Sequence, residues 1–140
     1  MRRILSAMGI MMLLCSALVL SAPATEKEKT AMVAAEKWLA LVDQGKYAQS
    51  WKESSELFRA AVTAEQWDQT LQGSRKPLGK VVSRKLKKAT YSDAVPGAPK
   101  GEYVVIQFDT AFENRAGSVE TVTPMLEKDG TWRVSGFYIQ

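Results

Sequence analysis

The sequence lacks histidine and has a single cysteine among its 140 residues. Without an imidazole, mechanisms that use histidine as the general base are excluded. One cysteine cannot form a disulfide within the chain, and without histidine it leaves no ligand set typical of zinc, copper or haem. The sequence also shows no Gly-rich phosphate loop, no G-x-S-x-G elbow and no D-x-[DN]-x-[DN]-G calcium loop. Carboxylate, hydroxyl, amine and guanidinium groups therefore remain for any chemistry, and we predict no cofactor and no metal.

The first segment has the layout of a secretory signal peptide. Met1–Arg3 is a short basic start, residues 4–20 are apolar or small, and Ala22 and Ala24 form an A-x-A cleavage pattern. The alternative is a membrane anchor, because the apolar run reaches the short limit of the roughly 17–25 residues that span a bilayer. No basic stop-transfer cluster follows the run. We therefore predict cleavage after Ala24, loss of Cys15 with the leader, and a periplasmic or secreted protein.

Residues 25–140 are expected to form one domain that begins with helices. Apolar residues recur at helical spacing over Glu26–Gln44, and a shorter helix is predicted over Lys46–Lys52. Residues 54–61 present another apolar face. A Thr-x-x-Gln capping box then predicts a helix that begins after Thr63 and ends near residue 73.

After Pro77 the apolar period changes from that of a helix to that of a strand. The first strand should place Val82, Arg84 and Leu86 on one face, and Glu102–Phe112 is the clearest strand. The remaining elements are expected to be a turn over Asn114–Ser118, a strand over Val119–Glu127, a hairpin turn at Asp129–Gly130 and a last strand over Thr131–Ile139. Helices followed by strands predict an α+β domain, with N-terminal helices packed on a curved antiparallel four-stranded sheet.

Several motifs, in their order and spacing, resemble one family. They are the stretch from Trp38 to Tyr47 with Ser50-Trp51, the segment Arg75-Lys76-Pro77-Leu78-Gly79 with Arg84, the pieces Gly101-Glu102-Tyr103, Phe108-Asp109-Thr110 and Glu120-Thr121-Val122, and the end Trp132–Ile139. Together they resemble the bacterial domain of unknown function 4019. The resemblance implies an exported protein with a cone-shaped α+β fold, similar to nuclear transport factor 2 and the cystatin-like group. It implies no established activity and no catalytic residues, and the fold itself hosts enzymes, binding modules and assembly domains.

A run of basic residues without any acidic residue lies between positions 75 and 88. Its members are Arg75, Lys76, Lys80, Arg84, Lys85, Lys87 and Lys88. Such a run is suited to an anionic surface, such as lipid head groups or cell-wall polymer, or to an acidic envelope protein. The alternative is a solvated edge strand whose lysines prevent edge-to-edge pairing. Nucleic acid is a poor candidate, because an exported protein rarely meets it and the net charge is only +4.

The aromatic residues and one glutamate supply the candidate ligand-binding residues. Aromatic side chains can line an apolar cleft, or they can pack in the core where helices meet the sheet. Glu120 shares a strand face with Val122 and Leu126, so on the inner face it is a carboxylate suited to a general acid or ligand anchor; otherwise it is a structural salt bridge or an exposed side chain. Arg75 belongs to a motif around Pro77 for which we predict mainly a structural role, and ligand binding by Arg75 is the second interpretation. The candidates are Trp38, Trp51, Tyr103, Glu120 and Arg75, and no catalytic site is predicted.

These observations favour a non-enzymatic binding or interaction module, with a small apolar pocket between helices and sheet. The alternative is a small hydrolase or isomerase that uses Glu120 or Asp109 as acid and base. A third hypothesis is an assembly domain that forms homo-oligomers through its sheet face.

Overall fold

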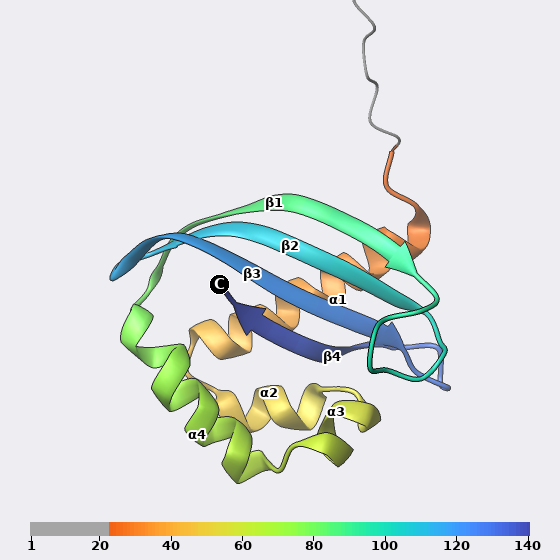
Figure 1. Ribbon diagram of the computed structural model, residues 1–140, viewed down its shortest axis with the longest axis horizontal. Coiled ribbons are helices and arrows are strands. Elements are labelled where there is room, and N and C mark those ends of the chain that lie inside the picture. Colours follow the sequence, from red (N-terminus) through yellow and green to blue (C-terminus); the bar gives the residue numbers. More distant parts are fainter. Residues whose placement is uncertain (1–22) are drawn as a thin grey trace, which may run out of the picture.

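The computed structural model describes residues 23–140 (Figure 1). Residues 1–22 of the predicted leader, which include Cys15, lie outside the described residues. The helices are α1 (Glu26–Asp43), α2 (Tyr47–Glu53), α3 (Glu56–Ala61), α4 (Ala64–Ser74) and the short 3-10 helix η1 (Lys76–Leu78). In this part of the chain, no helix combines the length and apolar character needed to cross a membrane.

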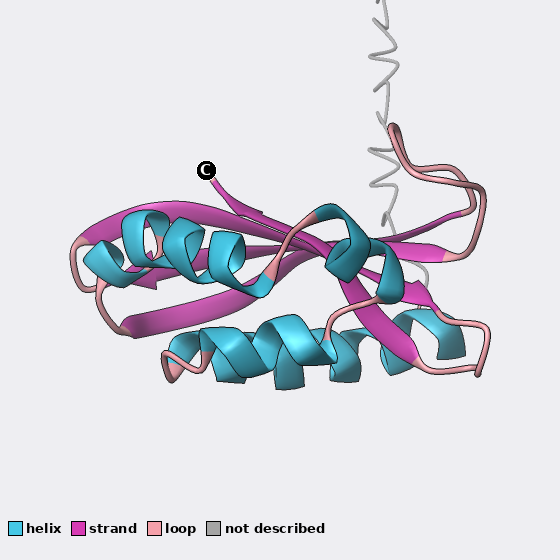
Figure 2. Ribbon diagram, turned by 90° about the horizontal axis from the view of Figure 1, so that it is seen from below, coloured by secondary structure: helices cyan, strands magenta, loops and turns pink. Residues whose placement is uncertain are grey.

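The strands follow the helices and form one antiparallel sheet within the described residues, in the order β1-β2-β3-β4. Their bounds are Val81–Ser92 for β1, Tyr103–Phe112 for β2, Arg115–Leu126 for β3 and Trp132–Ile139 for β4. The sheet is curved, with α1 behind it and α2, α3 and α4 beyond the β4 edge (Figures 1 and 2). This arrangement confirms the predicted α+β class and leaves β1 and β4 as the two edge strands.

Local sequence signals account for the ends of the helices. Thr25 caps α1 and Thr63 caps α4, each in a reciprocal capping box with the residue three positions later. Gly45 adopts φ 75° just after the C-cap residue of α1, Gln44, and Gly79 adopts φ 78° before β1. A Cβ at Gly79 would lie 3.0 Å from the Cβ of Glu113, so the chain needs glycine there to enter the sheet.

The core lies between α1 and the inner face of the sheet. Ala31 and Ala35 are fully buried and allow α1 to approach the strands closely. β2 contributes Val104, Ile106 and Phe108 to the same core, as its alternation predicts. Because small side chains on the helix face large ones on the strand, this interface is filled by side chains.

The tryptophans next to α2 belong to the core and are hydrogen-bonded. The ring centroid of Trp38 lies 6.0 Å from that of Trp67 and 5.2 Å from that of Phe137. The Trp38 Nε1 donates to the Ser50 carbonyl at 2.9 Å, and the Trp67 Nε1 donates to the Ser50 Oγ at 3.0 Å. Buried indoles need such acceptors, so Ser50 links the two rings to α2.

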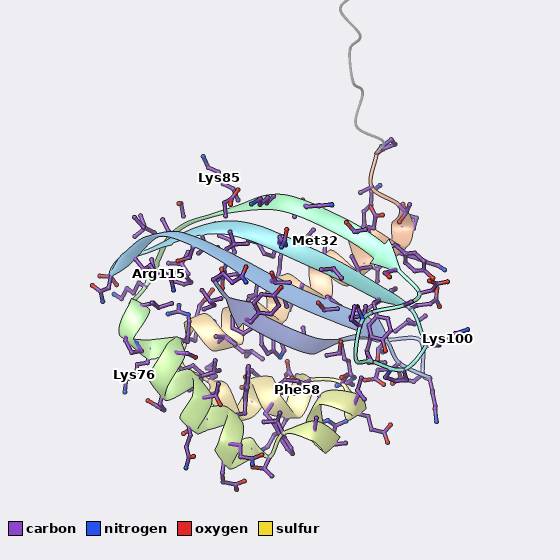
Figure 3. All side chains as sticks on the ribbon, viewed as in Figure 1. Met32, Phe58, Lys76, Lys85, Lys100 and Arg115 are labelled. Carbon is purple, nitrogen blue, oxygen red and sulfur yellow. The ribbon has the colours of Figure 1, made fainter. Side chains whose placement is uncertain are left out.

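Two strand predictions were wrong in detail. The turn expected over Asn114–Ser118 is shorter, because Phe112 already pairs with Arg115 and β3 extends to the end of the sheet where Arg115 lies (Figure 3). The first strand does not present one regular face, because its register with β2 shifts between Val81 and Ser83 and again between Leu86 and Lys88.

Replacing Ser50 tests the polar link in the aromatic core. Ser50→Ala removes the acceptor of the Trp67 indole N–H and should lower the free energy of unfolding by about 1–3 kcal/mol, because a buried donor is left without a partner. Urea unfolding measures the change. Ser74→Ala is the matched control, since Ser74 is exposed at the end of α4, and it should change stability by less than about 0.5 kcal/mol. Equal stability of the two variants would contradict the assigned role.

Candidate functional site

Glu120 is fully buried together with Val122 on the inner face of the sheet, which the alternation alone left undecided. Arg84 on β1 donates from Nε to the Glu120 Oε1 at 2.7 Å and from Nη2 to Oε2 at 3.1 Å. Thr110 on the intervening strand β2 donates from Oγ1 to the same Oε1 at 2.6 Å. The bidentate geometry and the third donor fill three of the roughly four acceptor positions of the carboxylate, which therefore links β1, β2 and β3.

A second carboxylate extends this cluster to the end of α1. Asp43 accepts from the Arg84 Nη1 at 2.8 Å and Nη2 at 3.0 Å, and from the Arg75 Nη2 at 3.3 Å. Arg75, which caps α4, also donates to the Gly79 carbonyl at 2.6 Å, and its guanidinium lies 4.6 Å from the Phe112 ring centroid. We call Asp43, Arg75, Arg84 and Glu120 the charge cluster. Its two carboxylates and two guanidiniums balance each other.

The contacts of the charge cluster indicate a structural role. Burial of the Arg84 guanidinium would lower its pKa, but hydrogen bonds to Asp43 and Glu120 outweigh burial and raise it above the ordinary value. Arg84 therefore stays charged. Glu120 is fully buried and its two oxygens accept hydrogen bonds from Arg84 and Thr110, so its carboxylate is not exposed at the surface where a substrate would bind.

The charge cluster also corrects the prediction that all basic residues between positions 75 and 88 form one surface for an anionic partner. Arg75 is 3% exposed and Arg84 is only partly exposed, and both are paired with carboxylates. They therefore do not belong to an exposed basic surface. The remaining members of the run are exposed to solvent: Lys76, Lys80, Lys85, Lys87 and Lys88.

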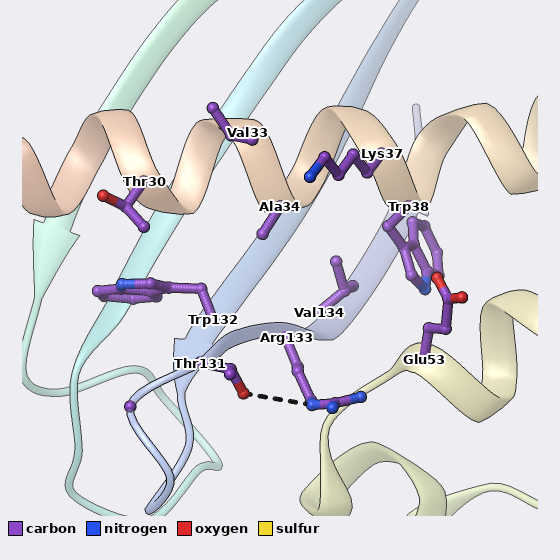
Figure 4. Close-up of a pocket in the computed structure, with 11 residues that line it drawn as sticks. Thr30, Val33, Ala34, Lys37, Trp38, Glu53, Thr131, Trp132, Arg133 and Val134 are labelled. Carbon is purple, nitrogen blue, oxygen red and sulfur yellow. Dashed lines mark hydrogen bonds between the residues drawn. The ribbon is translucent and has the colours of Figure 1, made fainter.

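A separate groove runs between α1 and the β4 hairpin (Figure 4). It has a volume of about 560 Å³. Its lining residues are Thr30, Val33, Ala34, Lys37, Trp38, Glu53, Gly130, Thr131, Trp132, Arg133 and Val134. We call it the α1–β4 groove. In Figure 4 the Trp132 ring lies at one end, and Trp38 and Glu53 lie at the other.

The α1–β4 groove combines an apolar floor with charged walls. Ala34, Trp132 and Val134 supply apolar surface, while Lys37 comes from α1 and Arg133 from β4 (Figure 4). Arg133 donates from Nε to the Thr131 Oγ1 at 3.4 Å. Within residues 23–140 neither cation forms a salt bridge. An unpaired ammonium and an unpaired guanidinium that line the same groove as an indole ring can bind an acidic group attached to an apolar body.

The predicted ligand-binding residues do not meet in one site. Trp38 contributes to the α1–β4 groove but is 2% exposed. The Trp51 indole donates to the Val62 carbonyl at 2.6 Å, and the Tyr103 hydroxyl donates to the Pro99 carbonyl at 2.6 Å. Burial raises the pKa of Tyr103. Glu120 and Arg75 belong to the charge cluster, so the structural interpretation of both residues agrees with their contacts.

Sequence reasoning missed the cations of the groove. Thr30, Ala34 and Lys37 follow helical spacing and so lie along one side of α1, which is a signal present in the sequence. Nothing in that spacing shows that Trp132 and Arg133 face this side. The pairing of α1 with β4 depends on the tertiary arrangement.

Neutralising Glu120 tests the charge cluster. Glu120→Gln removes the carboxylate beside Arg84 and should lower the free energy of unfolding by about 3 kcal/mol, because a guanidinium then lacks its buried partner. Chemical denaturation measures the loss. Glu36→Gln on the exposed side of α1 is the control and should stay within about 0.5 kcal/mol of the parent. A parent-like Glu120→Gln variant would show that the pairing contributes nothing.

Comparison with known proteins gives a family but no activity. No curated protein matches the chain. The family described as "Protein of unknown function (DUF4019)" matches residues 34–137, which include the charge cluster and most of the α1–β4 groove. Because this match spans more than half of the sequence, the chain belongs to the DUF4019 family.

Proposed function

We propose that this domain is an exported, non-enzymatic binding module whose ligand occupies the α1–β4 groove. The observation that carries the proposal is the pair of unpaired cations, Lys37 and Arg133, that line an apolar groove beside Trp132. The ligand class is an amphipathic small molecule with an apolar body and an acidic group.

Size and charge support this ligand class. The groove volume of about 560 Å³ falls in the range typical of small-molecule sites, roughly 300–1,000 Å³. Glu53 is the carboxylate in the lining, so Lys37 and Arg133 leave an excess of positive charge. The indole of Trp132 offers a flat apolar surface for the body of the ligand.

The positions of the candidate carboxylates favour binding over acid–base catalysis. Glu120 is held by Arg84 and Thr110 and has no exposed surface. Asp109 is on the opposite face of β2, with a side chain 61% exposed. Neither carboxylate lines the α1–β4 groove.

The proposal includes export and the cone-shaped fold similar to nuclear transport factor 2 and the cystatin-like group. The curved sheet with one long helix packed against it supports the fold similarity (Figure 1). The position of the first helix supports processing after Ala24, because Thr25 caps α1 and would be retained. The working protein would then be residues 25–140 in the periplasm or outside the cell.

Binding of 1-anilinonaphthalene-8-sulfonate, an aromatic body with one sulfonate, tests the groove. Its fluorescence should rise saturably with protein, and decanoate should displace it better than decanol. Lys37→Gln with Arg133→Gln should weaken binding at least about tenfold, because charge-assisted hydrogen bonds to the acidic group are lost. Lys29→Gln with Lys46→Gln removes the same charge from exposed positions outside the groove and should leave affinity unchanged. Equal weakening by both double variants would reject the site.

Export is tested by expressing the full chain in a Gram-negative host and fractionating the cells. Intact-mass measurement of the periplasmic or secreted protein should give a chain that starts at Thr25. Ala22→Asp with Ala24→Asp should block processing, because the cleavage site needs small residues. A full-length chain that stays in the membrane fraction would instead identify an uncleaved anchor.

A further inference from the structure

The β1 edge of the sheet carries an exposed surface that the α1–β4 groove does not use. Its members are Lys80, Val82, Lys85, Leu86, Lys87 and Lys88, all exposed, and we call them the β1 ridge. Figure 3 shows Lys85 pointing away from the sheet at this edge. Because β1 and β4 are opposite edges, the ridge and the groove lie on different sides of the domain.

The exposure of the apolar residues in the β1 ridge is not explained by the usual role of lysines on an edge strand. Lysines on an edge strand prevent pairing with other sheets, and that role requires no exposed apolar side chain. Val82 is nevertheless 69% exposed and Leu86 is 55% exposed. Leu86 pairs with Phe108, which is buried, yet Leu86 itself remains more than half exposed. Bulky apolar side chains among cations are typical of surfaces that enter a membrane interface.

The ridge keeps a positive charge after its neighbours are counted. Lys87 Nζ lies 3.9 Å from the Asp109 Oδ1, and both side chains are at least half exposed. Glu113 is bound through Oε1 to the backbone N–H of Lys80 at 2.7 Å. These carboxylates offset part of the charge of the ridge lysines and leave an excess of cations. The surface is therefore complementary to an anionic partner.

The irregular backbone of β1 favours a fluid surface over an extended peptide. A peptide that adds to a sheet edge needs a regular row of backbone donors and acceptors. The register shifts at Val81/Ser83 and Leu86/Lys88 interrupt that row at the positions of the ridge. Head groups of a bilayer need no such register.

We propose that the β1 ridge docks the domain edge-on against an anionic lipid bilayer, with its lysines at the phosphates and with Val82 and Leu86 at the boundary of the acyl chains. Each lysine near an anionic surface strengthens partitioning roughly fivefold, and salt weakens the attraction. The opposite edge, with the α1–β4 groove, stays open to solvent in this orientation. The proposal therefore stands independently of the groove ligand.

Cosedimentation of the purified protein with phosphatidylglycerol/phosphatidylcholine vesicles tests the ridge. The protein should partition to these vesicles at low ionic strength, should not bind pure phosphatidylcholine vesicles, and should be released by salt. Lys85→Gln with Lys87→Gln and Lys88→Gln should weaken partitioning at least about 25-fold. Val82→Ser with Leu86→Ser should weaken it severalfold without changing the net charge. Because all these positions are exposed, the variants should fold, and circular dichroism with thermal unfolding verifies this.

The matched control is Lys46→Gln with Lys52→Gln and Lys128→Gln, which removes equal charge from exposed positions outside the ridge. This control should bind vesicles much more tightly than the ridge triple variant. Equal loss in both would show attraction by net charge alone and would overturn the assignment. Absence of binding to anionic vesicles would overturn it as well. If a polyglutamate peptide binds as tightly as the vesicles and the Val82/Leu86 double variant matches the parent, the ridge recognises an acidic protein and the membrane proposal is wrong.

Discussion

The bidentate pair between Arg84 and Glu120 is the interaction on which the arrangement of this domain depends. It joins β1 to β3 across β2, and Arg84 continues to Asp43 at the end of α1. Arg75 adds the end of α4 through the same aspartate. Elements from both halves of the chain therefore meet at one group of balanced charges. Burying such charges is costly unless every partner is present, so the cluster favours one register and one position of α1 over alternatives.

Under the proposed function, the charge cluster at the C-terminal end of α1 has a structural role and the α1–β4 groove has the binding role. The groove has apolar surface, a volume suited to a small ligand, and the unpaired side chains of Lys37 and Arg133. In the cluster, each guanidinium faces a carboxylate. Positive charge that is paired contributes to folding, whereas positive charge left unpaired at an apolar surface is available for a ligand.

Features set by local sequence were predictable, and features set by tertiary pairing were not. The capping boxes at Thr25 and Thr63 and the alternation in β2 involve neighbouring residues, so they can be read directly. The shift in register after Leu86 depends on how β1 meets β2, and no pattern within β1 reports it. The partner of Glu120 could not be chosen from the sequence, since several arginines had the right chemistry and only the sheet order selects Arg84.

The reciprocal cap of α1 has a consequence for the electrostatics of processing. The backbone nitrogen of Thr25 donates to the Glu28 Oε2 at 3.3 Å. Cleavage after Ala24 would convert this amide nitrogen into an α-ammonium group at the positive end of a helix dipole, which is an unfavourable place for a cation. Glu28 already lies against that nitrogen and would neutralise the new charge. The mature terminus would thus be held in an ion pair at the start of the helix.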